Sequence, residues 1–153
     1  EYFGAMVDCV FAHEGALDKF IGDALMAYWG APEPHEDDAL RAVRAAQDMR
    51  RALERLNARW RTEGRPELHA GIAVHRGEAF VGNIGSPQRL EYTLIGDTVN
   101  VTSKLCSAAA GNEILVTEVV QAGLPATVTT RPRPDIVPVR RLGDDLRIWE
   151  VLA

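Results

Sequence analysis

The longest periodic segment of the chain runs from residue 39 to residue 60 and limits the possible folds more than any other feature. Its apolar side chains recur at intervals of three and four residues, which places them on one helix face; they are Ala39, Val43, Ala46, Met49, Leu53, Leu56 and Trp60. Pro34 and the acidic residues 36–38 come just before, and negative charge favours the start of a helix. A helix with one apolar face must pack against another layer of structure.

Strand-like segments lie on both sides of this helix. Residues 17–20 and 25–29 favour two strands joined at Gly22-Asp23, because glycine tolerates the positive φ of a tight turn. Residues 68–74 alternate in polarity, and Arg76-Gly77 indicates a turn into a returning strand over residues 78–84.

A further strand is predicted at residues 92–95, followed by a helix that ends near Ala110 and is capped by Asp97 or Thr98. The other predicted elements are a helix at 2–13, a strand at 114–117, a short helix at 118–122 and edge strands within 127–152. Because helices alternate with strands and hairpins, we expect a single α+β domain over residues 1–153, with helices packed on one face of a sheet.

The composition is that of a globular domain, with 46% hydrophobic and 25% charged residues. The net charge is −5 and no run of Lys and Arg is present, so we expect no nucleic-acid partner. Cys9 and Cys106 lack metal-site or disulfide spacing, and we expect buried thiols in a reducing compartment, the cytoplasm. No apolar run approaches the ~20 residues that span a bilayer. The chain begins without methionine, and we expect it to belong to a longer protein.

Two groups of residues could carry chemistry. Asp23 at the tip of a hairpin suits a hard cation, although an aspartate in such a turn more often binds backbone N–H groups. Lys19 on the preceding strand could equally extend from a sheet edge into solvent. Asn100 and Lys104 stand four residues apart on one helix face near its start, which favours a phosphate site or an ordinary polar face.

Three segments, in this order, resemble the class III adenylyl and guanylyl cyclases. Residues 17–27 are similar to the metal-binding hairpin of that family, residues 71–77 with 81–85 to its next hairpin, and residues 92–100 to its purine and transition-state segment. Diguanylate cyclases have a related core, but their hairpin carries two glycines followed by acidic residues. The resemblance implies the class III cyclase fold, with a ferredoxin-like or palm-type sheet.

The resemblance also implies a role for each site residue. Asp23 corresponds to the second of two aspartates that bind Mg²⁺ or Mn²⁺, two ions per site. Lys19 and Thr93 correspond to the pair that recognises the ring nitrogen and amino group of adenine, where guanylyl cyclases typically have glutamate and cysteine. Asn100 corresponds to the residue that orients the ribose. Lys104 stands where the family has an arginine that stabilises the charge developing on the phosphates.

The implied function is that of an adenylate cyclase, which converts ATP to 3′,5′-cyclic AMP and pyrophosphate in cyclic-nucleotide signalling. Family members form head-to-tail dimers with shared sites, so Lys19 and Asp23 would serve opposite sites of a homodimer. A fused sensor or regulatory domain is also expected. The main alternative is a non-catalytic cyclase-homology domain that binds nucleotide or dimerises, and another is a fragment without activity of its own.

Two departures from the family pattern bear on activity. The family begins with a strand that carries the first metal aspartate, followed by a loop that holds the triphosphate. These 153 residues do not contain that strand and loop, and we expect the natural protein to supply them. Lys104 keeps the positive charge of the family's arginine but lacks the planar fork that holds two phosphate oxygens at once.

Overall fold

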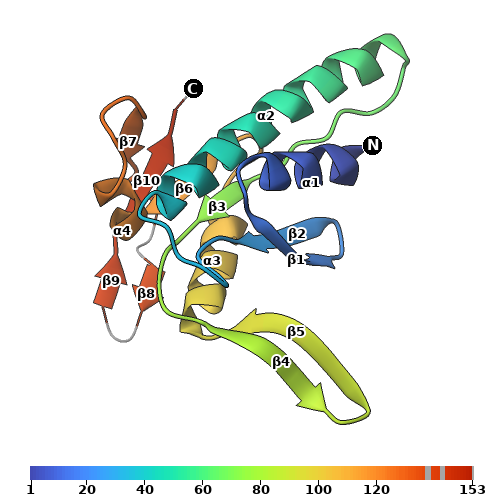
Figure 1. The fold of residues 1–153 in the computed structure, drawn as a ribbon. Coiled ribbons are helices and arrows are strands. Elements are labelled where there is room, and N and C mark those ends of the chain that lie inside the picture. Colours follow the sequence, from blue (N-terminus) through green and yellow to red (C-terminus); the bar gives the residue numbers. More distant parts are fainter. Residues whose placement is uncertain (137–138, 142–143, 153) are drawn as a thin grey trace.

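The computed structural model describes residues 1–136, 139–141 and 144–152. Helices and strands alternate along the chain as predicted for an α+β protein (Figure 1). In order, they are α1 (Tyr2–Ala12), β1 (Ala16–Ile21), β2 (Ala24–Tyr28), α2 (Asp38–Thr62), β3 (Ile72–Val74), β4 (Phe80–Ser86), β5 (Arg89–Ile95), α3 (Asp97–Ala108), β6 (Ile114–Thr117), α4 (Glu118–Ala122), β7 (Thr130–Pro132), β8 (Val139–Arg141), β9 (Asp144–Leu146) and β10 (Ile148–Val151).

The main sheet has the strand order β3-β6-β10-β7. β3 runs parallel to β6, whereas β10 is antiparallel to both β6 and β7. The hairpins β1-β2, β4-β5 and β8-β9 form separate two-stranded sheets. In Figure 1 the β4-β5 hairpin extends away from the body of the molecule, so much of its surface is open to contacts.

The core lies on both sides of β6. Ile114 and Val116 pack with Val43 of α2, and α1 packs beside α2 on the same face of the sheet (Figure 1). Leu115 packs instead with Leu105 of α3. Successive side chains of a strand point to opposite faces, so α3 covers the face away from α2. The expectation that the helices pack on one face of the sheet therefore holds for α1 and α2. Helix α3 packs on the opposite face, because β6 carries apolar side chains on both of its faces.

The long helix and the first hairpin form as the sequence predicts. Along α2 the predicted stripe is buried or half-buried, with Val43, Ala46 and Leu53 at most 3% exposed. The turn between β1 and β2 is Gly22-Asp23, and Gly22 adopts a φ of 60°. Nothing lies within 4 Å of the position that a Cβ of Gly22 would occupy, so glycine is favoured there by its backbone conformation alone.

The predicted hairpin around Arg76-Gly77 is wrong. β3 pairs with β6, placing Ile72 opposite Ile114, and it does not pair with the strand that follows it. That following strand, β4, pairs with β5 instead, from Phe80 opposite Ile95 to Ser86 opposite Arg89. Polarity alternation identifies a strand but not its partner, and here the apolar β3 is stabilised by burial on the central β6.

Two further expectations need correction. Asp97 and Thr98 do not cap α3, which begins after Gly96 without a side-chain cap; the Thr98 hydroxyl donates instead to the carbonyl of Glu78, at 2.5 Å. In the C-terminal segment, β10 is an interior strand rather than an edge, because it pairs on both sides. β7, which contains Pro132, is the edge strand, as expected for a residue without an N–H to donate.

Cys9 and Cys106 are free and half-buried, and burial raises the pKa of both thiols. In the part of the chain that the structure describes, no helix has the length and apolar composition needed to cross a bilayer.

Candidate functional site

An irregularity in β1 positions the first group of side chains. Leu17 lies opposite Ala27 and Lys19 lies opposite Met26, so Asp18 is the extra residue of a β-bulge. Neighbouring side chains of a regular strand point to opposite faces, whereas a bulge redirects them. Here two consecutive side chains, Asp18 and Lys19, both reach β5.

Lys19 and Thr93 meet at the carboxylate of Asp18. The Thr93 hydroxyl donates to Asp18 Oδ2 over 2.9 Å, and Lys19 Nζ lies 3.8 Å from the same oxygen. Lys19 Nζ also lies 3.2 Å from Glu91 Oε1, two residues before Thr93 on β5. The side chain of Asp18 is 1% exposed and Thr93 is 5% exposed, while the Lys19 side chain is 33% exposed. The group thus combines a buried acceptor with a partly accessible cation.

Asp23 is separate from this group. It is exposed at the tip of the β1-β2 hairpin, and its carboxylate makes no hydrogen bond or ion pair with any described residue. The charge of Asp23 affects Tyr2 of α1. Burial raises the pKa of Tyr2, and the negative charge of Asp23 raises it further. The carboxylate is therefore available for a ligand.

Asn100 and Lys104 lie on the exposed face of α3, and neither side chain makes a hydrogen bond or ion pair with another described residue. Val101 and Leu105, one position further along in each case, are buried against β6 and β10. The helix phase that buries these two residues turns the amide and the ammonium group toward solvent together. This arrangement suits an anionic ligand, which both groups could contact from the same side.

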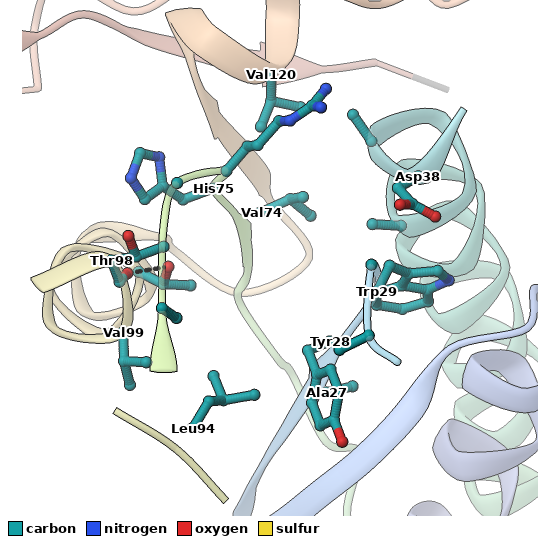
Figure 2. A pocket seen from close by; sticks show the side chains of 18 of the residues that line it. Ala27, Tyr28, Trp29, Asp38, Val74, His75, Leu94, Thr98, Val99 and Val120 are labelled. Atoms are coloured by element: carbon teal, nitrogen blue, oxygen red, sulfur yellow. Dashed lines mark hydrogen bonds between the residues drawn. The ribbon is translucent and has the colours of Figure 1, made fainter. Parts of the chain in front are cut away.

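A cavity of about 330 Å³ lies between β2 and β3. Tyr28 and Trp29 line one side and Val74 and His75 another, with Val99 of α3 also contributing (Figure 2). None of the five site residues predicted from the sequence lines it. The His75 side chain is hydrogen-bonded to Thr117 of β6, with 2.8 Å between His75 Nδ1 and the Thr117 hydroxyl.

The structure thus brings Lys19 and Thr93 together, pairs Asn100 with Lys104 on one helix face, and leaves Asp23 apart. Sequence reasoning missed Asp18 and Glu91, the two carboxylates beside Lys19. Asp18 is adjacent to Lys19 in sequence, but strand alternation would place it on the other face. Only the bulge brings it into the group.

The family model for the adenylate and guanylate cyclase catalytic domain matches residues 5–149. The chain belongs to this family. The cyclase domain is 37% identical over 134 residues to Adenylate cyclase 1 of Rhizobium meliloti (strain 1021), covering 86% of this chain and 20% of that protein. It spans about a fifth of the length of this relative.

Solved cyclase structures share the fold. The crystal structure of the guanylyl cyclase Cya2 has a TM-score of 0.83 at 34% identity, with 98% of this chain and 76% of that chain covered. The adenylyl cyclase CyaB from P. aeruginosa has a TM-score of 0.88 at 28% identity, with 99% and 79% covered. The class III resemblance is therefore confirmed. One neighbour is a guanylyl and the other an adenylyl cyclase, so the likenesses identify a cyclase catalytic domain without choosing its purine.

Proposed function

We propose that the complete domain is an adenylate cyclase that converts ATP to 3′,5′-cyclic AMP and pyrophosphate. The observation that carries this proposal is the contact group on β1 and β5, where Lys19 and Thr93 share the carboxylate of Asp18. These two residues occupy the purine-recognition positions of the family, and the pair corresponds to the adenylyl rather than the guanylyl pattern.

The chemistry of the two groups fits adenine. A lysine ammonium only donates hydrogen bonds, and N1 of adenine accepts one, whereas N1 of guanine carries a hydrogen. The Thr93 hydroxyl can accept from the 6-amino group of adenine, because its proton is donated to Asp18. Guanine presents a donor to Lys19 and an acceptor to Thr93, so both contacts would be mismatched.

The reaction is an intramolecular phosphoryl transfer, in which the ribose 3′-oxygen attacks the α-phosphorus and pyrophosphate leaves. The proposed role of Asn100 is to hold the ribose so that its 3′-oxygen lies in line with the departing pyrophosphate. Lys104, on the same exposed face of α3, is proposed to stabilise the charge that develops on the phosphates. Correct positioning and charge stabilisation account for most of the catalysis in such reactions.

Asp23 fits one part of a divalent metal site. Its exposed carboxylate has no partner among the described residues and supplies the oxygen ligands that Mg²⁺ and Mn²⁺ prefer. No three potential ligands gather in the described part of the chain, so further ligands must come from elsewhere. Bound divalent cations would neutralise charge on the attacking and leaving oxygens.

The cavity between β2 and β3 supports the expected additional strand. Each of the two strands is the last in its sheet, so among the described residues neither has a strand partner on the side away from β1 or β6. Residues of both strands line the cavity. We propose that the strand with the first metal aspartate pairs here, which would satisfy two exposed strand edges and join the two sheets.

A homodimer with shared sites is supported by apolar side chains left in solvent on the two hairpins. Six of these are between 48% and 61% exposed: Phe20, Ile21, Phe80, Leu90, Tyr92 and Ile95. Large apolar side chains concentrated on adjacent hairpins are typical of protein interfaces. A fused sensor domain remains a prediction.

The test is cyclic nucleotide production from ATP and from GTP, with Mg²⁺ and with Mn²⁺. The natural protein, with the additional strand proposed above, is compared with the 153-residue chain. Cyclic AMP from the longer protein, in excess of cyclic GTP, is the expected result. The second candidate function is a non-catalytic homology domain, because Lys104 stands where the family has an arginine. This candidate would be favoured if the longer protein is folded and dimeric but makes neither product.

A further inference from the structure

Asp18 does not correspond to any of the site residues predicted from the sequence, yet it contacts Thr93, and its surroundings are unusual. Its side chain is 1% exposed. Oδ2 accepts from Thr93, but Oδ1 is buried and has no hydrogen-bond partner among the described residues. Burying a polar atom without a partner is unfavourable, so the stability of the fold alone does not explain a carboxylate here.

The hydrogen bond between Asp18 and Thr93 fixes the direction in which the threonine hydroxyl can act. A hydroxyl has one proton to donate and two lone pairs that accept, whereas a carboxylate only accepts. The proton in the 2.9 Å contact therefore belongs to Thr93, and it is committed to Asp18. What Thr93 can still offer a ligand is a lone pair.

We infer that Asp18 is a specificity-determining positioning residue, which selects a 6-aminopurine over a 6-oxopurine by holding the Thr93 hydroxyl as an acceptor. This inference rests on the proposed purine site at Lys19 and Thr93. A free threonine hydroxyl could rotate to donate to the 6-oxygen of guanine and would discriminate poorly. When its proton is donated to Asp18, the hydroxyl presents a lone pair to the base. That lone pair accepts a hydrogen bond from the amino group of adenine, whereas it repels the 6-oxygen of guanine.

The bulge in β1 makes this arrangement possible. It allows Asp18 and Lys19 to approach the same side of β5, so that Asp18 contacts Thr93 while Lys19 contacts Glu91. Glu91 provides a matched control, because it is the second carboxylate beside Lys19 but does not contact Thr93. Its side chain is 61% exposed, so substitution there disturbs no buried group.

The experiment measures kcat/KM for ATP and for GTP in the natural full-length protein and in four variants: Asp18→Asn, Glu91→Gln, Thr93→Val, and Thr93→Val combined with Asp18→Asn. Asp18→Asn keeps the side-chain volume, and its amide can donate to Thr93 and release the threonine proton. We expect the ATP preference to fall at least about tenfold, the factor that one mismatched hydrogen bond to a base typically produces. Glu91→Gln should keep the preference. In Thr93→Val, the further change Asp18→Asn should leave the preference unaltered.

Three outcomes would overturn the inference. The first is an unchanged ATP preference in an Asp18→Asn protein whose thermal unfolding shows it to be folded. The second is an equal loss in Glu91→Gln, which would assign the effect to the charge around Lys19. The third is a further fall in the ATP preference when Asp18→Asn is added to the Thr93→Val protein.

Binding of 3′-deoxy-ATP and 3′-deoxy-GTP, which lack the attacking hydroxyl, separates this inference from the proposed activity. Suppose that the protein makes no cyclic nucleotide but binds the adenine analogue preferentially, and that Asp18→Asn weakens this preference. This result would support the role of Asp18 and refute the cyclase activity. If the protein cyclises ATP preferentially and Asp18→Asn leaves this preference unchanged, the cyclase activity is supported and the role of Asp18 is refuted. Wild-type protein that binds both analogues equally, or neither, would overturn the role of Asp18.

Discussion

Lys104 lies on the exposed face of α3, four residues after Asn100, and carries the cation proposed to stabilise the transition state. We expect Lys104→Arg to raise kcat with little change in KM, because the guanidinium fork can hold two phosphate oxygens at once. Complete loss of such a donor lowers kcat by ~10²–10³, and lysine already supplies the charge, so the gain should be less than about 10²-fold. Steady-state kinetics with ATP measure it. A slower Lys104→Arg enzyme would show that the site is adapted to lysine.

Lys19 and Thr93 allow a second residue-scale prediction, which concerns the purine. Replacing both with the residues typical of guanylyl cyclases, Lys19→Glu with Thr93→Cys, should shift the preference from ATP toward GTP. Glutamate accepts from the N1 hydrogen of guanine, and it can no longer donate to adenine. Competition between the two nucleotides in one reaction gives the ratio directly. An unchanged ratio would show that other residues recognise the base.

At the scale of elements, the β1-β2 hairpin depends on the left-handed conformation of Gly22. Gly22→Ala should lower the free energy of unfolding by about 1 kcal/mol, because a Cβ is disfavoured at this φ although space is available. Gly4→Ala in α1 is the matched control, since its Cβ also meets nothing within 4 Å. That change should raise the free energy of unfolding by about 0.5–1 kcal/mol. Urea unfolding measures both, and equal effects would contradict the argument.

A charged cluster ties β10 to the segments on either side of it. Arg133 Nη1 lies 2.8 Å from Glu113 Oε1 and 3.0 Å from Glu150 Oε2, and the three side chains are at most 21% exposed. A hydrogen bond from the backbone N–H of Ala110 and a second from Arg133 lower the pKa of Glu113 below its ordinary value of 4.5. A carboxyl with a lowered folded-state pKa stabilises the fold above its unfolded pKa and loses that contribution as pH falls.

We therefore expect the free energy of unfolding to decline as pH falls below 4.5 toward the folded-state pKa of Glu113. Arg133→Gln should make this decline shallower, because it removes hydrogen bonds that lower the pKa of Glu113 and the pKa of Asp135. Arg131→Gln is the control, since Arg131 pairs with Glu150 and has no contact with Glu113. Urea unfolding above and below pH 4.5 measures the slopes. Equal slopes in both variants would show that Glu113 does not govern the acid response.

At the scale of the whole molecule, Lys19 and Asp23 of one chain are expected to serve opposite sites of the homodimer, and we propose that Asn100 serves the same site as Lys19. Natural full-length protein carrying Asp23→Ala and protein carrying Asn100→Ala should each be inactive. When they are mixed and allowed to exchange subunits, half of the dimers are mixed and each keeps one intact site, so about a quarter of the wild-type activity should return. Activity against mixing ratio measures it, and no recovery despite subunit exchange would refute shared sites.

The sequence by itself determined the elements that depend on neighbours along the chain. The stripe of α2, the Gly22-Asp23 turn and the phase of Asn100 and Lys104 on α3 follow from periodicity and backbone preference, which act over a few residues. Tertiary structure decided the rest: β3 joined β6 rather than β4, and a bulge turned Asp18 toward Thr93. Strand partners and bulges are selected by burial and hydrogen bonding between segments distant in sequence. Asp18 and Thr93 are 75 residues apart, and no local pattern could have placed one beside the other.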